Sequence, residues 1–259
     1  MAEHGGFDHN RQSLRIVTEL ESRYPHWPGL NLTYEVREGI VKHETEYDLS
    51  NSAAAGFDPA TRGSIEAQIA NVADELAYNA HDLDDGLRAE LIEPGQLDAL
   101  SIWQMLKESI GWDGRHFTEQ IRHRIIRRML GIEIDDVIRA TGEMLARHDL
   151  NSADDLQRLP YNVVVHSDEI RAMNQELKQF LYTELYRHHR VVRMAVKAER
   201  FITQLFETYV NEPAQLPPTV QAAIESRGIH RAVADYIAGM TDRFALQEWQ
   251  RLFDPFTRP

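Results

Sequence analysis

Three side chains that could bind a metal or a substrate follow one another at helical spacing. Asp74, Tyr78 and Asp82 occupy positions i, i+4 and i+8, and residues at this spacing project from roughly one face of an α-helix. A carboxylate is costly to bury unless it is paired or coordinates a metal. Asp74 is therefore a candidate metal ligand, and Tyr78 and Asp82 are candidate substrate contacts.

The segment that must position these side chains is residues 65–91. Its apolar residues recur every three or four positions, which predicts an amphipathic helix, and Ser64 is a candidate N-cap. The apolar stripe borders the face of Asp74, so the carboxylates are expected to point inward or into a cleft. A solvated acidic face is the alternative interpretation, and the spacing alone favours it. The nearby acidic residues that support this alternative are Glu66, Glu75, Asp84, Asp85 and Glu90.

Two further groups of polar residues could take part in chemistry. His4 and His9 lie close together before the first predicted helix, where they could act as acid–base groups or phosphate contacts; an ordinary chain end is the alternative. Arginine forms bidentate pairs with phosphate, so an arginine cluster could bind an effector nucleotide or lie in a charged subunit interface. The arginines of this cluster are Arg115, Arg122, Arg124, Arg127 and Arg128.

Composition excludes several classes of protein. The 259 residues carry a net charge of −13 and contain no cysteine, so disulfides, thiolate nucleophiles and cysteine-based zinc sites are absent. The charge argues against general affinity for nucleic acids or membranes, which are polyanionic. No apolar run reaches the length of a membrane span, and residues 1–10 lack a signal-peptide pattern. A cytoplasmic setting is expected.

The remaining sequence predicts an all-α fold. Helices are expected at about 11–24, 34–43, 96–110, 117–148 with a break at Gly131, 168–189, 191–211 and 229–253. Residues 44–63 are predicted to be a loop. The β-branched run 161–165 indicates either an edge strand or a buried loop.

Four segments together resemble the HD-domain deoxynucleoside triphosphate triphosphohydrolases, the dGTPase-like family. They are HGGFDHNRQSLRIVTELE (4–21), PGLNLTYEVREGIVKHE (28–44), IEAQIANVADELAYNAHDLDDGL (65–87) and RAVADYIAGMTDRFAL (231–246). The resemblance covers nearly the whole chain in the same order. It implies the C-terminal part of an HD-type helical bundle at residues 1–112 and a helical phosphohydrolase-associated region at 113–259.

The resemblance also implies roles for individual residues. Asp74 matches the family's last metal ligand, and Tyr78 and Asp82 match positions that contact the sugar and phosphates. His9 matches an active-site histidine near the phosphates, although the family usually has glutamate where this chain has Asp8. The implied cofactor is a divalent metal, Mg²⁺ or Mn²⁺. The implied partners are deoxynucleoside triphosphates, a possible effector nucleotide and further copies of the chain in a homo-oligomer.

One part of the family pattern has no match. The family's first metal histidine, its His-Asp dipeptide and the following glycine-proline segment lie upstream of the first matching motif. His81-Asp82 is not a substitute, because it comes after the last ligand and lacks the glycine-proline segment. Either the chain is a fragment or short-start version of a dNTP triphosphohydrolase, or it is a non-catalytic oligomerisation or nucleotide-sensing relative. The presence of Asp74, Tyr78 and Asp82 favours the first.

Overall fold

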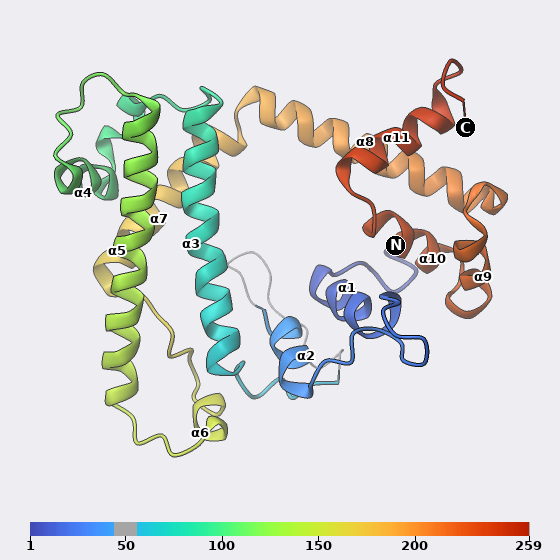
Figure 1. Cartoon of the computed structure of the whole chain (residues 1–259), viewed down its shortest axis with the longest axis horizontal. Helices are drawn as coiled ribbons and strands as arrows, with labels where there is room; N and C mark the ends of the chain where they lie inside the picture. The colour runs from blue at the N-terminus through green and yellow to red at the C-terminus, as the bar shows by residue number, and fades with distance from the viewer. Residues whose placement is uncertain (44–55, 259) are drawn as a thin grey trace. The chain divides into compact units, whose positions relative to one another are not determined.

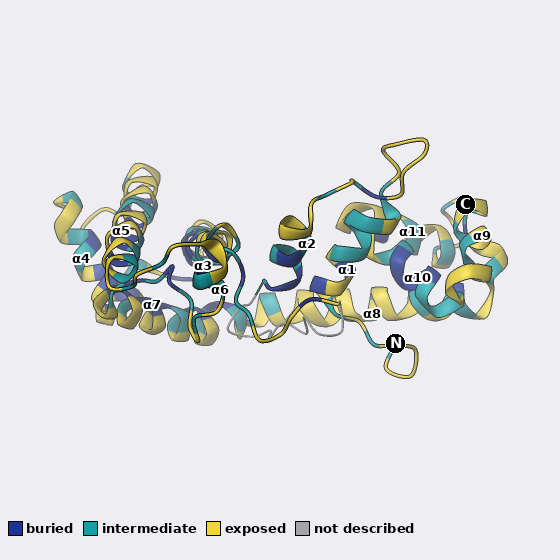
Figure 2. Ribbon diagram, turned by 90° about the horizontal axis from the view of Figure 1, so that it is seen from below, coloured by how far each residue is buried: buried dark blue, intermediate teal, exposed yellow. Residues whose placement is uncertain are grey.

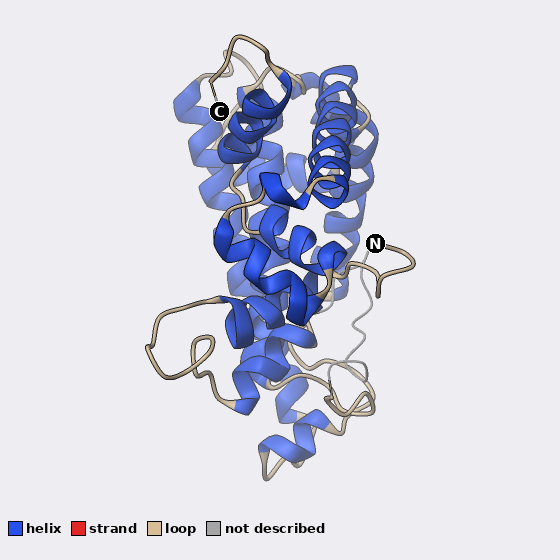
Figure 3. Cartoon of the chain, turned by 90° about the vertical axis from the view of Figure 1, so that its right-hand side faces the viewer, coloured by secondary structure: helices blue, strands red, loops and turns tan. Residues whose placement is uncertain are grey.

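The computed structural model describes residues 1–43 and 56–258. The regular elements in these ranges are helices, and the described residues contain no β-strand beyond two isolated bridges, Ser22–Gly29 and Tyr24–Trp27 (Figure 3). The predicted all-α fold is confirmed. Within the described part of the chain, no helix has the length and apolar character needed to cross a membrane.

The chain forms two compact units. The first unit comprises Met1–Gln12 and His189–Pro259, and the second comprises Ser13–His188. The first contains α8 (His189–Asn211), η5 (Pro213–Gln215), α9 (Pro218–Arg227), α10 (Ile229–Ala238) and α11 (Asp242–Phe253) (Figure 1). The predicted family-domain boundary at residues 112 and 113 stays a prediction, and it does not coincide with this division into compact units.

The second unit holds the predicted site helix. The short helix α1 (His9–Arg15) runs from the first unit into the second. The other elements of the second unit are η1 (Ile16–Leu20), α2 (Tyr34–Val41), α3 (Ile65–Arg88), η3 (Pro94–Ala99), α4 (Ser101–Ile110), α5 (Glu119–Ala146), α6 (Ala153–Gln157), α7 (Asp168–Leu181) and η4 (Tyr182–Tyr186).

Three helices begin after a capping side chain, and one of the three, Ser64, was predicted. The side chains of Thr33, Ser64 and Ser167 each accept a hydrogen bond from a backbone N–H in the first turn of the following helix, which satisfies one of the donors left unpaired at a helix N-terminus. The predicted loop 44–63 lies in part outside the described residues, since only 56–63 are described.

Two sequence predictions need correction, and for a third segment the structure decides between the two alternatives. Helix α5 continues through Gly131, because a single glycine weakens a helix without ending it. The predicted helix 229–253 is two helices, α10 and α11, separated at Gly239–Thr241, where Thr241 caps α11. The run 161–165 is the buried loop and not the strand, because Val163 and Val164 donate their backbone N–H groups to Gln68 of α3.

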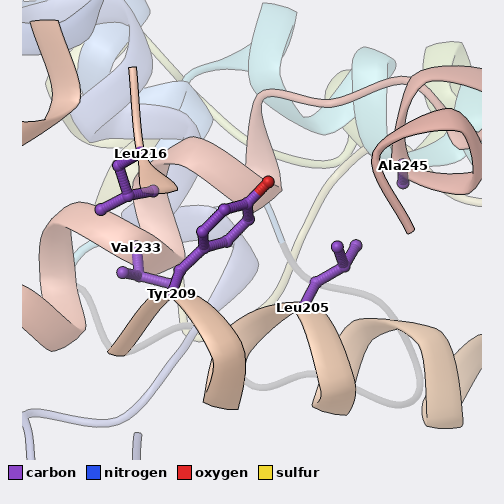
Figure 4. Packing of buried hydrophobic residues seen from close by; sticks show 5 residues of the cluster. All are labelled: Leu205, Tyr209, Leu216, Val233 and Ala245. Carbon is purple, nitrogen blue, oxygen red and sulfur yellow. The ribbon is translucent and has the colours of Figure 1, made fainter. Parts of the chain in front are cut away.

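Each unit has its own core. In the second unit α3, α4, α5 and α7 pack together, and the apolar side chains at their contacts are almost completely buried (Figure 2). They include Leu83, Trp103, Leu106, Ile125, Met129 and Leu177. In the first unit, Leu205 and Tyr209 of α8 form a cluster with Leu216, Val233 and Ala245 (Figure 4).

Candidate functional site

Helix α3 carries three of the four predicted site residues. Asp74, Tyr78 and Asp82 lie one turn apart along it, while its buried residues pack against α5 and α7. The side chain of Asp74 is 61% exposed and Tyr78 is 55% exposed, whereas Asp82 is half-buried. Of the two carboxylates expected to point inward, Asp82 is therefore the one that does so, whereas Asp74 is exposed.

The carboxylate of Asp74 faces an imidazole from α2's C-terminal end. His43 Nε2 lies 3.6 Å from Asp74 Oδ2, and His43 Nδ1 lies 2.5 Å from Asn71 Oδ1, one turn earlier on α3. Helix α2 packs on α3 and so places His43 there. An imidazole and a carboxylate can both serve as ligands of a divalent metal.

Asp82 is held by a tyrosine from the end of the α7–η4 helical segment. The Tyr186 hydroxyl donates a hydrogen bond to Asp82 Oδ2, and the ring of Tyr186 lies 6.4 Å from that of Tyr78. Burial raises the pKa of the Asp82 carboxyl, and the hydrogen bond from Tyr186 partly opposes that rise. Burial, and then the hydrogen bond to Asp82, raise the pKa of the Tyr186 phenol, so this hydroxyl stays protonated and remains a donor. The result is an ordered carboxylate beside an exposed aromatic ring.

This contact gives a first testable prediction. Tyr186→Phe removes the donor and leaves a half-buried carboxylate without it, so we expect a loss of about 2 kcal/mol in the free energy of unfolding at pH 7. We also expect the pKa of Asp82 to rise further. Urea unfolding measures the first, and an NMR titration of the Asp82 carboxyl carbon measures the second. Tyr182→Phe is the matched control, since Tyr182 is 44% exposed. Equal losses in both variants, or an unchanged Asp82 titration, would contradict the assigned role.

His9 belongs to the other compact unit. It is the first residue of α1, where the Asp8 side chain accepts a hydrogen bond of 2.7 Å from the Arg11 N–H, and its side chain is exposed. Asp8 thus caps this helix. A role for His9 beside the residues of α3 stays a prediction.

The arginine cluster does not converge on one point. Arg122 is buried and forms an ion pair with Asp84 of α3, and Arg124 donates to the carbonyl oxygen of Ile110 at 2.7 Å. Arg127 and Arg128 are exposed, and so is Arg115. At least two of the five arginines therefore hold helices together within the second unit.

The described residues supply too few ligands for a catalytic metal. Within residues 1–43 and 56–258, no three histidine, aspartate or glutamate side chains come together to hold an ion. A catalytic zinc site, for comparison, takes three protein ligands and a water. Asp74 and His43 make two donors, so the residues present do not by themselves fit the implied metal.

Sequence reasoning missed His43 and Tyr186 as neighbours of the site. Tyr186 meets Asp82 across 104 residues of chain, and no local pattern signals such a pairing. His43 lies inside the second matching motif, which is a signal that could have drawn attention to it. Its spacing in the sequence, however, does not relate it to Asp74.

Two comparisons with known proteins agree with the resemblance: a match to a family model and a set of similar proteins. The phosphohydrolase-associated domain family matches residues 164–251. A deoxyguanosinetriphosphate triphosphohydrolase-like protein of Geobacter sulfurreducens is 47% identical over 257 residues, which cover 98% of this chain and 66% of that protein. Proteins of the same name from Bordetella pertussis and Nitrosomonas europaea are 43% and 42% identical, over 96% and 98% of this chain and 65% and 68% of their own lengths.

The chain thus spans about two thirds of the length of these relatives. The identity extends through α3 and its neighbours as well as through the matched domain, which is what the order of the four motifs indicates. This chain belongs to the deoxyguanosinetriphosphate triphosphohydrolase-like family.

Proposed function

We propose that this chain acts in the hydrolysis of deoxynucleoside triphosphates to deoxynucleoside and inorganic tripolyphosphate. The observation that supports this most directly is the ordered Asp82 carboxylate beside the exposed ring of Tyr78. The names of the relatives give the substrate class, because they are called deoxyguanosinetriphosphate triphosphohydrolase-like. A cytoplasmic setting belongs to the same proposal.

In this proposal Asp82 and Tyr78 bind the sugar end of the nucleotide. A carboxylate fixed by a tyrosine hydroxyl keeps one oxygen free of that bond, and it can accept a hydrogen bond from the 3′-hydroxyl. The exposed face of Tyr78 can pack against the deoxyribose, with its hydroxyl reaching the phosphates. Positions set by a rigid helix are held more closely than positions on loops, so the one-turn spacing between these residues along α3 would set substrate orientation.

Asp74 is assigned as a ligand of a divalent metal, Mg²⁺ or Mn²⁺, with His43 as its neighbour. Such an ion, when bound, would polarise the phosphate oxygens. The ligands found among the described residues are incomplete, so the role assigned to this chain is binding and orientation. His9 is assigned to phosphate contact or proton movement.

The experiment is tripolyphosphate release from the four common deoxynucleoside triphosphates, with Mg²⁺ or Mn²⁺ and with EDTA as a control. In a version that also carries the remaining metal ligands, we expect release that depends on metal and falls by about 100-fold or more in Asp74→Ala, because losing a charged ligand weakens metal binding. Asp85→Ala is the matched control, since Asp85 is an exposed carboxylate of the same helix. Equal release from Asp74→Ala and the unchanged chain would contradict the assignment.

A non-catalytic nucleotide-sensing relative is the second candidate. The observation in its favour is that Arg127 and Arg128 are exposed and, among the described residues, form no ion pair. Binding of a deoxynucleoside triphosphate without turnover, measured by calorimetry, would support this candidate if binding survived Asp74→Ala and was lost in Arg127→Ala with Arg128→Ala.

A further inference from the structure

Three polar side chains are buried where α5 and α7 pack on α3 (Figure 1). Glu133 of α5 is completely inaccessible to solvent, Asn174 of α7 is 2% exposed, and His166, two residues before α7, is 8% exposed. Neither carboxylate oxygen of Glu133, neither amide atom of Asn174 and neither ring nitrogen of His166 has a hydrogen-bond partner among the described residues. We call these three side chains the inner polar site.

The three side chains are close to one another although they come from separate segments. The Asn174 amide is a direct neighbour of the Glu133 carboxyl. Glu133 and His166 share two charged neighbours, because a carboxylate of α3, Glu75, and an ammonium of α7, Lys178, lie within electrostatic range of both. Glu75 and Lys178 are paired at 2.6 Å, which joins α3 to α7 beside the site. The unpartnered atoms therefore belong to one buried region.

The inner polar site carries no net charge of its own near neutral pH. Burial raises the pKa of the Glu133 carboxyl to about 8, so this group keeps its proton. Burial also lowers the pKa of the His166 imidazole, although the carboxylates of Glu75 and Asp136 partly oppose that shift. Asp136 Oδ2 lies 3.6 Å from His166 Nδ1. The site thus consists of a carboxylic acid, a carboxamide and a neutral imidazole, and each of these offers both a donor and an acceptor.

This composition favours a neutral ligand that both donates and accepts hydrogen bonds. Buried polar atoms are costly unless they are paired, because they have lost their hydrogen bonds to solvent. A cation needs ionised or otherwise free acceptors, and no three histidine, aspartate or glutamate side chains of the described residues come together to hold an ion. An anion needs donors without competing acceptors. A buried water molecule suits the site, since it typically makes about three hydrogen bonds to such groups.

We propose that the inner polar site binds ordered water molecules, which join Glu133 of α5 by hydrogen bonds to Asn174 of α7 and to His166 before it. The site lies beside Glu75, the residue that follows Asp74 on α3. The water molecules therefore support the buried side of the helix whose Asp74 and Tyr78 are exposed. They connect three segments that are far apart in the sequence.

The test compares two substitutions of Glu133 in the full chain. Oxygen-17 relaxation dispersion of the solvent counts long-lived internal water molecules. Glu133→Gln keeps a donor and an acceptor in the shape of the protonated carboxyl, so we expect an unchanged count. Glu133→Leu has a similar volume and removes both, so we expect a loss of about one or two water molecules. Equal counts in all three proteins, or an equal loss in both variants, overturn the proposal.

A high-resolution crystal structure of the unchanged chain provides a test that does not depend on how a variant folds. We expect density for water within hydrogen-bond distance of at least two members of the inner polar site. Direct hydrogen bonds between the Glu133 carboxyl and Asn174 or His166, with no water between them, overturn the proposal.

Melting temperatures in different salts test whether the site holds a cation instead. We expect KCl, MgCl₂ and tetramethylammonium chloride at equal ionic strength to leave the same difference in melting temperature between the unchanged chain and Glu133→Gln. Binding of Mg²⁺ near Asp74 would shift both proteins equally and leave that difference intact. A stabilisation by K⁺ or Mg²⁺ that Glu133→Gln abolishes would show a cation on the ionised carboxylate and overturn the assignment to water.

Discussion

Replacing Glu133 with glutamine is expected to stabilise the folded chain by about 4 to 5 kcal/mol at pH 8 and by almost nothing at pH 4.5. Glu133 lies on the buried face of α5 and is completely inaccessible to solvent, and neither of its carboxylate oxygens has a hydrogen-bond partner among the described residues. Burial raises the pKa of this carboxyl from 4.5 to about 8. At neutral pH the group therefore keeps its proton in the folded chain.

The groups around Glu133 act in both directions. The Asn174 amide and the Lys178 ammonium favour the ionised form, whereas Glu75 opposes it, and burial remains the largest effect. Lys178 is itself engaged, because its ammonium lies 2.6 Å from Glu75 Oε1. Because the Lys178 ammonium is already paired with Glu75, it offsets little of the cost of ionising the buried Glu133 carboxyl.

The sign of the pH dependence follows from the raised pKa. In the unfolded chain Glu133 loses its proton near pH 4.5, while the folded chain holds it up to about pH 8. Below pH 4.5 both states are protonated and the group costs nothing. Between pH 4.5 and 8 the unfolded state is increasingly favoured by ionisation, so the free energy of unfolding falls, and above pH 8 the loss is complete. Glutamine has no proton to lose and removes this fall.

Urea unfolding of both proteins between pH 4.5 and 9 measures the effect. The difference between the two curves isolates Glu133, because other titrating groups such as His166 contribute equally to both. Glu143→Gln is the matched control on the same helix, since Glu143 is half exposed and pairs with Arg139, and it should change stability by no more than about 1 kcal/mol. A constant difference across this pH range for Glu133→Gln would show that the carboxyl is ionised in the folded state.

The helices of this fold could be predicted where their signals are local. These signals come from residues that lie close together in the sequence. Examples are the apolar period of residues 65–91 and the caps at Ser64 and Ser167, and the structure has helices there. The division of 229–253 into two helices was missed, because Thr241 can be read either as a helix residue or as a cap. Its cap hydrogen bond to the Phe244 N–H decides the matter.

Contacts between distant segments could not be predicted in the same way. The buried amide of Gln68 accepts from Val163 N–H at 2.7 Å and donates to the carbonyl oxygen of Gly63 at 3.0 Å. The Gln68 amide oxygen thus satisfies the buried N–H groups of Val163 and Val164 without a neighbouring strand. Since a run of β-branched residues is equally compatible with a strand, only the position of α3 distinguishes the two. Asp82 and Tyr186 are a second example, and the resemblance to a family named Asp82 without naming its partner.

Replacing Gly29 with alanine is expected to lower the free energy of unfolding by about 2 to 5 kcal/mol. Gly29 has a φ of +68°, in the left-handed region. A Cβ atom there would overlap the Val17 carbonyl oxygen and lie 2.5 Å from the Thr18 carbonyl carbon. Those atoms are backbone and cannot rotate away, because Leu30 N–H donates to that same Val17 oxygen at 2.7 Å.

Gly111→Ala provides the control that separates the two costs. Gly111 has a φ of +65°, nearly the same as Gly29, but an added Cβ would meet no atom within 4 Å. Its replacement should therefore cost only the backbone strain, about 1 to 2 kcal/mol. Both glycines lie in the second unit, so the same unfolding transition reports on both. Equal losses would mean that the chain at residues 17–18 moves away readily, and the predicted close approach would be wrong.

The excess loss in Gly29→Ala also bears on the candidate site. The turn at Gly29 connects η1 to α2, and α2 leads directly to His43 beside Asp74. A methyl group at position 29 must push the turn away from residues 17–18, and α2 follows the turn. A loss of stability accompanied by a changed NMR titration of His43 would show that this turn fixes the imidazole next to the carboxylate. A loss of stability with an unchanged His43 titration would show that the packing of α2 on α3 is enough to hold it there.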